Sequence, residues 1–152
     1  MRKESPSEQQ KDIFWEAYNE VSKLGIWLDD TAAITTAETR ARLLALKAKE
    51  NADLLAFDYI DLSGDKGETE ELRTSGIARQ LKAIAKAADV PVIAACQLNR
   101  EVERRQNKRP VLSDLRYSGM LEQVADVVLF LYRDDYYSQR GMKQKEADME
   151  NV

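Results

Sequence analysis

The chain has 152 residues, of which 43% are hydrophobic and 33% are charged, so it is long enough for one folded domain with an apolar core. It has no histidine and one cysteine, Cys96, which excludes a histidine–metal site, a Ser–His–Asp triad and an internal disulfide. The net charge is −4, the N-terminus is polar and the apolar runs are short, so we expect a cytoplasmic protein without a membrane span.

The first third of the chain is predicted to contain two helices and a short strand. Apolar residues recur at helical spacing over residues 9–24, and Gly25 is suited to end that helix. The apolar run 25–28 is predicted to be a strand. A second helix follows, capped by Thr35 or Thr36, because both side chains can accept a hydrogen bond from the first turn.

The rest of the chain alternates between strands and helices. The apolar runs are continuous, which is typical of parallel strands that are buried on both faces. The predicted elements are, in order, a strand at 54–60, a helix at 70–88, a strand at 91–96, a short helix at 119–124 and a strand at 126–132. The residues expected to face the core from the long helix are Leu72, Ile77, Leu81, Ile84 and Ala85.

This order predicts an α/β domain with a mostly parallel sheet flanked by helices. We expect residues 1–152 to form part of one such domain, with flexible ends at 1–8 and 138–152.

Two polar residues follow predicted strands at positions where α/β proteins bind ligands. Asp58 comes after a run of apolar residues, an arrangement that can hold the Mg²⁺ of a bound nucleotide. Gln97 ends the next strand, and its amide could orient a water or respond to a phosphate. The alternative for each is structural: an aspartate that caps a loop, and a polar residue where a strand ends.

Acidic and basic residues are segregated along the chain, which suggests two surfaces with different partners. Residues 53–71 carry seven acids and one base. Residues 99–116 carry six bases, which could neutralise the phosphates of a nucleic acid. These bases are Arg100, Arg104, Arg105, Lys108, Arg109 and Arg116. The alternative is a solvated loop whose bases pair locally with Glu101 and Glu103.

These motifs, in this order, resemble the motifs of the DnaB-type replicative DNA helicases. Residues 54–62 (LLAFDYIDL) resemble the Walker-B strand of that family, and residues 91–105 resemble its next strand and the helicase motif after it. Residues 108–128 resemble the DNA-facing loop and the following strand, and residues 27–31 (WLDDT) resemble a strand that ends in Asp-Asp-Thr. The family usually has a glutamine where Asp61 stands and an acid where Tyr117 stands.

The resemblance implies a RecA-like P-loop NTPase core in a ring-shaped homo-hexamer that hydrolyses ATP and translocates on single-stranded DNA. Asp58 would hold Mg²⁺ through water, and Gln97 would couple the nucleotide to the DNA side. Helicase loader and primase are implied as further partners. The residues implied to bind DNA are Arg116, Tyr117, Gly119, Arg100, Arg105, Lys108 and Arg109, of which Arg100 and Arg105 could instead lie at the subunit interface.

The phosphate-binding motif Gly-x-x-x-x-Gly-Lys-Ser/Thr does not occur in the 152 residues. By the resemblance, the catalytic glutamate and the Lys-x-Arg finger of the family would also lie outside them. We therefore expect an incomplete core that does not hydrolyse ATP in isolation. Two alternatives remain: a truncated, non-enzymatic module that binds single-stranded DNA or helicase subunits, and a RecA-like recombinase-type ATPase.

Overall fold

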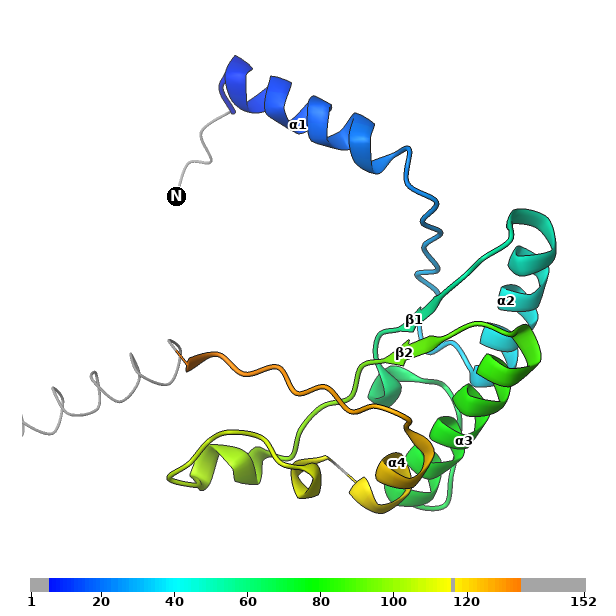
Figure 1. The fold of residues 1–152 in the computed structure, drawn as a ribbon, viewed down its shortest axis with the longest axis vertical. Helices are drawn as coiled ribbons and strands as arrows, with labels where there is room; N and C mark the ends of the chain where they lie inside the picture. Colours follow the sequence, from blue (N-terminus) through cyan, green and yellow to red (C-terminus); the bar gives the residue numbers. More distant parts are fainter. Residues whose placement is uncertain (1–5, 116, 135–152) are drawn as a thin grey trace, which may run out of the picture. The chain divides into compact units, whose positions relative to one another are not determined.

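The computed structural model describes residues 6–115 and 117–134, and the chain divides into two compact units, Met1–Thr31 and Ala32–Val152 (Figure 1). Of the ends predicted to be flexible, residues 1–5 and 138–152 lie outside the described residues. Within the described residues, no helix has the length and apolar character that crossing a membrane requires.

The first unit contains helix α1, Glu8–Val21. A capping box explains its start, because Ser7 Oγ accepts from the Gln10 amide at 3.3 Å and Gln10 Oε1 accepts from the Ser7 amide at 2.9 Å. The helix ends at Val21, before Gly25. The strand predicted at 25–28 is wrong: these residues have no strand partner among those the structure describes, and an extended segment needs one to become a strand.

The second unit is built on a strand–helix–strand arrangement. Strand β1 (Leu55–Phe57) pairs in parallel with β2 (Val92–Ala94), and helix α3 (Glu70–Ala88) connects them. Helix α2 (Thr36–Glu50) precedes β1 and packs beside α3 (Figure 1). The predicted parallel sheet flanked by helices is therefore confirmed.

Helices α2 and α3 begin and end at residues with clear capping roles. Thr35 and Glu38 form a capping box at the start of α2, so of the two proposed caps the structure selects Thr35. Thr69 Oγ1 accepts from the Leu72 amide at the start of α3. Asn51 and Asp89 end the two helices with φ angles of 55° and 51°, the left-handed conformation that is common after a helix.

The core lies between the two helices and one face of the sheet. The residues buried there include Leu43, Phe57, Ile60, Ile77, Leu81 and Ile84. Leu72 was predicted to face this core, but it is 53% exposed because it lies in the first turn of α3, on the outer side. The prediction that both strands are buried on both faces is also wrong: Leu54 and Ile93 are exposed, since no described helix of the second unit covers their side of the sheet.

The chain after β2 forms two short 3-10 helices, η2 (Arg100–Arg104) and η3 (Leu112–Asp114), and then helix α4 (Ser118–Val124), which was predicted and packs on α3. The strand predicted at 126–132 is wrong. These residues have no strand partner among those described, and Leu131 is 95% exposed.

Candidate functional site

Asp58 and Gln97 leave the sheet at the same edge. Phe57 is opposite Ala94 in the parallel register, so both chains pass the carboxyl end of the sheet together. The pairing continues beyond the strands, because the Ala95 amide donates to the Phe57 carbonyl and the Ile60 amide donates to the Ala95 carbonyl, both at 3.0 Å. Both side chains are exposed. They can therefore meet a ligand bound at this edge.

Arg73 of α3 holds the segment that follows Asp58. Its guanidinium donates to the carbonyls of Ser63 at 3.3 Å and Asp61 at 3.4 Å, and it pairs with Glu70 at 2.8 Å. The carbonyl contacts fix the loop beyond the short 3-10 helix η1 (Ile60–Leu62) against α3. Asp58 thus lies on a backbone that is anchored on both sides: by the sheet before it and by Arg73 after it.

Asp65 joins the same loop to the start of α2. Its carboxylate accepts from the Thr36 amide at 2.7 Å, from the Thr36 hydroxyl at 2.8 Å and from the Ser63 hydroxyl at 2.6 Å. Partial burial alone would raise the pKa of Asp65, but the hydrogen bonds from Ser63 and Thr36 and the charge of Arg73 outweigh it, and the pKa lies below the ordinary value. This role was not predicted from the sequence.

Gly64 allows the loop to approach the segment before α2 closely. A Cβ atom at this position would lie 2.1 Å from the Ala33 carbonyl oxygen, so another residue could not be accommodated without moving the backbone. The Gly64 amide donates to the Ile34 carbonyl at 3.2 Å. The acidic segment after β1 is therefore a structural loop, and its contacts with Arg73 and with the start of α2 hold the chain that follows Asp58.

The predicted basic stretch folds into a closed loop over residues 98–115, here called the basic loop. Leu98 and Leu115 form an isolated antiparallel bridge at its base, and the Asn99 amide donates to the Asp114 carbonyl at 2.7 Å. Val102, a residue of the loop itself, is buried. The bases of this loop are thus carried on an ordered backbone rather than on an extended linker.

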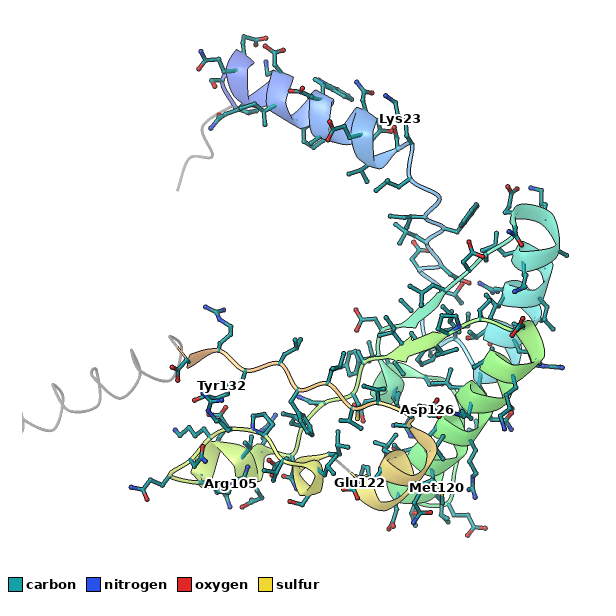
Figure 2. All side chains as sticks on the ribbon, in the orientation of Figure 1. Lys23, Arg105, Met120, Glu122, Asp126 and Tyr132 are labelled. Atoms are coloured by element: carbon teal, nitrogen blue, oxygen red, sulfur yellow. The ribbon has the colours of Figure 1, made fainter. Side chains whose placement is uncertain are left out.

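Arg105 and Asp114 pair across the basic loop (Figure 2 labels Arg105). Asp114 Oδ2 accepts from Arg105 Nη2 and, at 2.8 Å, from the Val111 amide. Arg105 Nη2 also donates to the Arg109 carbonyl at 3.3 Å. The Asp114 side chain is 7% exposed and that of Arg105 is 38% exposed. Arg105, predicted to contact DNA, is therefore already engaged inside the loop.

The other predicted DNA-binding residues lie around this loop and at the start of α4. Arg100 begins η2 and is exposed, and the Arg109 guanidinium carbon lies 5.1 Å from the ring centre of Tyr132. Lys108 is partly buried within the loop. Tyr117 precedes α4 with a φ of 60°, and Gly119 is exposed in the first turn. Arg116 lies outside the described residues.

Helix α4 packs on α3 through buried Leu121, and an ion pair at its end joins the two elements as well. Lys82 of α3 donates to Asp126, which follows α4 and is labelled in Figure 2. The hydrogen bond and charge of Lys82 hold the pKa of Asp126 below its ordinary value. The backbone at Tyr117 and Gly119 is thus tied to the same helix that supports the sheet.

The exposed carboxylate predicted to serve a nucleotide-bound metal ion, that of Asp58, has no cluster of further metal ligands around it among the described residues. No group of three or more His, Cys, Asp or Glu side chains among them could hold a metal by itself. A single exposed carboxylate such as that of Asp58 is compatible with a nucleotide-bound Mg²⁺, since Mg²⁺ usually keeps several waters and takes its remaining ligands from one or two carboxylates and from phosphate oxygens.

Comparisons with known proteins agree on one family. The model of the "DnaB-like helicase C terminal domain" matches residues 1–151. The chain is 46% identical over 139 residues to the replicative DNA helicase DnaB of Geobacillus stearothermophilus, covering 90% of the chain and 29% of that protein. It is 44% identical, with the same coverage, to the replicative DNA helicase DnaC of Bacillus subtilis. The chain thus spans less than a third of the length of these relatives.

Solved structures give the same result. A DnaB-like replicative helicase, described with its interactions with primase, superposes with a TM-score of 0.79 at 37% identity, over 88% of this chain and 33% of that one. A second solved structure, described as an ATPase domain, superposes with a TM-score of 0.79 at 38% identity, over 91% of this chain and 50% of that one.

Proposed function

The chain belongs to the DnaB-like helicase C-terminal domain family, and from this premise we propose that it is the middle part of the ATPase domain of an ATP-dependent replicative DNA helicase. The complete protein would translocate on single-stranded DNA and unwind the duplex at the replication fork. A recombinase-type ATPase is disfavoured, since the family match extends over residues 1–151 and so includes the basic loop.

The observation that carries this proposal is the direct connection between the sheet edge and the basic loop. Gln97 lies at the edge that would face a nucleotide, and the Asn99 amide, two residues on, is already bonded to Asp114 at the base of the loop. A displacement of Gln97 would therefore be passed to the basic loop within two residues. This short path would couple the state of the nucleotide to the grip on DNA.

Asp58 would hold the Mg²⁺ of bound ATP through water, and Gln97 would report the state of the nucleotide. The metal ion, when bound, neutralises charge on the phosphates. The chain's own contribution is to keep the carboxylate of Asp58 at a fixed place and exposed to that ligand, because its neighbours are anchored by the sheet and by Arg73. The phosphate-binding loop would come from the rest of the protein.

The basic loop and the start of α4 would contact the DNA backbone. Arg100, Lys108, Arg109 and Arg116 would neutralise phosphates, and the backbone at Tyr117 and Gly119 would approach the sugar–phosphate chain. Such binding is independent of sequence and weakens with salt, because each neutralised phosphate releases bound counterions. Both properties suit a protein that moves along single-stranded DNA.

The complete protein would act as a homo-hexamer and would meet a helicase loader and primase. One structural relative is described together with its interactions with primase, which supports that partner. We also propose a cytoplasmic location for the complete protein, because the replicative helicases that the chain resembles come from bacteria, whose DNA lies in the cytoplasm.

A second candidate is a non-enzymatic module that binds single-stranded DNA or docks on intact helicase subunits. The absence of the Gly-x-x-x-x-Gly-Lys-Ser/Thr motif from the 152 residues favours it. The DNA that flanks the coding sequence decides between the two. A helicase segment predicts this motif in frame upstream and a Lys-x-Arg downstream, whereas stop codons at both ends would leave the non-enzymatic module.

A further inference from the structure

We propose that Arg105 and Asp114 form a clip that positions the basic loop for DNA, so that Arg105 acts through the loop and not as a phosphate contact. This inference rests on the proposed function, because it assigns the basic loop to DNA. Arg105 would be a positioning residue, and the phosphate contacts would come from its neighbours on the loop.

Asp114 is the centre of the clip because it receives hydrogen bonds from three separate points of the loop. Its carbonyl accepts from the Asn99 amide at 2.7 Å, and its carboxylate accepts from Arg105 and from the Val111 amide. These donors lie at the start, the middle and the end of the loop. One buried residue therefore fixes the path of the whole segment.

Arg105 extends the clip to the tip of the loop. The same Nη2 that donates to Asp114 also donates to the Arg109 carbonyl, which holds the turn that carries Lys108 and Arg109. Its Nε is buried and has no hydrogen-bond partner in residues 6–115 and 117–134. Although the side chain is 38% exposed, its Nη2 already donates to two acceptors within the loop, which favours a positioning role over a phosphate contact.

A second ion pair in the same loop offers a matched contrast. Arg104 pairs with Glu101 at 3.0 Å, three residues away, and the two side chains are 79% and 60% exposed. That pair joins neighbours within η2 and crosses no part of the loop. Removing it should leave the path of the loop unchanged, since exposed pairs of this kind contribute little.

The two roles of Arg105 predict opposite effects when Asp114 is neutralised. If Arg105 contacts phosphate, Asp114→Asn removes a negative charge near DNA and frees Arg105, so affinity should rise. If Arg105 and Asp114 form a clip, Asp114→Asn loosens the loop and affinity should fall. A loss of affinity despite the removal of a negative charge is therefore the result that the clip predicts, because it requires that the path of the loop depend on Asp114.

The test is the binding of the 152-residue chain to a fluorescently labelled oligothymidylate at low salt, measured by anisotropy. We expect Arg105→Gln and Asp114→Asn each to weaken binding on the order of tenfold, and the double variant to be no weaker than either one, as for residues that act as a unit. Glu101→Gln is the control and should not weaken binding. Stronger binding by Asp114→Asn, or additive losses in the double variant, would overturn the clip.

Two further measurements test the clip if Asp114→Asn does not fold or if the chain does not bind DNA. Arg105→Lys keeps the charge and leaves Asp114 intact, so a direct phosphate contact predicts wild-type affinity and the clip predicts a loss. Amide hydrogen exchange at Asn99 and Val111 should be faster in Arg105→Gln than in the wild type. Unchanged amide exchange would refute the clip. A wild-type chain that does not bind single-stranded DNA would refute the proposed function only.

Discussion

Replacing Asp65 by alanine should destabilise the fold, because this carboxylate joins the loop after β1 to the start of α2. The change removes three hydrogen bonds, from the Thr36 amide, the Thr36 hydroxyl and the Ser63 hydroxyl. The Thr36 amide lies in the first turn of α2, where amides have no partner within the helix. Its bond to Asp65 therefore acts as a cap.

The expected loss is about 3 kcal/mol in the free energy of unfolding, taking about 1 kcal/mol for each hydrogen bond. The cap-type bond accounts for about 1 kcal/mol of this. Each of the two bonds from hydroxyls adds at least about 1 kcal/mol, because Thr36 and Ser63 are buried and their hydroxyls lose this acceptor without gaining water. The charge of Asp65 near the N-terminus of α2 adds roughly 0.3–1 kcal/mol to the loss from these hydrogen bonds.

Urea unfolding of the 152-residue chain, followed by far-ultraviolet circular dichroism, measures this loss directly. Asp65→Ala should lower the midpoint without changing the slope, because the same surface is exposed on unfolding. Glu68→Ala is the matched control, as Glu68 is an exposed acid of the same loop. Equal urea midpoints for the two variants would show that the Asp65 carboxylate does not stabilise the fold more than an exposed acid does.

The same aspartate predicts how stability depends on pH. The folded-state pKa of Asp65 is below the ordinary value, so the unfolded chain takes up its proton first as pH falls. Its contribution is complete above the ordinary aspartate pKa and is lost as pH falls through the lowered, folded-state pKa. The difference between wild type and Asp65→Ala should therefore shrink on acidification in that range. A difference that grows there would contradict the hydrogen-bond account.

Three further outcomes are expected. Ile77→Ala, at a side chain that is 1% exposed, should cost about 2–5 kcal/mol in the free energy of unfolding, while Leu72→Ala should cost far less. Similar losses for the two variants in urea unfolding would contradict the assigned core. Arg100→Gln should weaken the binding of single-stranded DNA and reduce the slope of log affinity against log salt by about 0.7, as for one lost phosphate contact. An unchanged slope would exclude that contact. The isolated 152-residue chain should release no phosphate from ATP, because it lacks a phosphate-binding loop; steady turnover would refute this.

The helices of this chain could be predicted from the sequence because their signals are local. Thr35 and Glu38 form a capping box within four residues, and Ile77, Leu81 and Ile84 recur at helical spacing and are buried together. The helix at residues 70–88 agrees with α3 for the same reason, and the short helix before residue 125 is also present. Such features need no information from distant residues.

The strands were predicted less well because a strand exists only with a neighbour. Residues 54–60 and 91–96 pair with each other, but only Leu55–Phe57 and Val92–Ala94 form the sheet. Residues 25–28 and 126–132 have equally apolar sequences and no partner among those described. The composition of a strand indicates that it can pair, and the partner has to be supplied by the fold.

The candidate site was predicted in its residue types and only partly in its contacts. The positions of Asp58 and Gln97 after neighbouring strands follow from the apolar runs before them. The basic residues were visible as a charge block, but the pair of Arg105 with Asp114 was not, because Glu101 and Glu103 are closer in sequence. The structure selects Asp114 since the loop closes at Leu98 and Leu115, which brings that buried carboxylate beneath Arg105.

We propose that Asp58 serves the ATPase site of a helicase, and a single measurement decides whether it does. That measurement is ATP hydrolysis by the complete product of the reading frame, with and without single-stranded DNA, in the wild type and in Asp58→Asn. We expect hydrolysis that DNA stimulates and that falls by orders of magnitude in the variant, because the carboxylate proposed to hold the metal ion is lost. Hydrolysis that is absent from the wild type, or is unchanged in Asp58→Asn, would contradict this proposal.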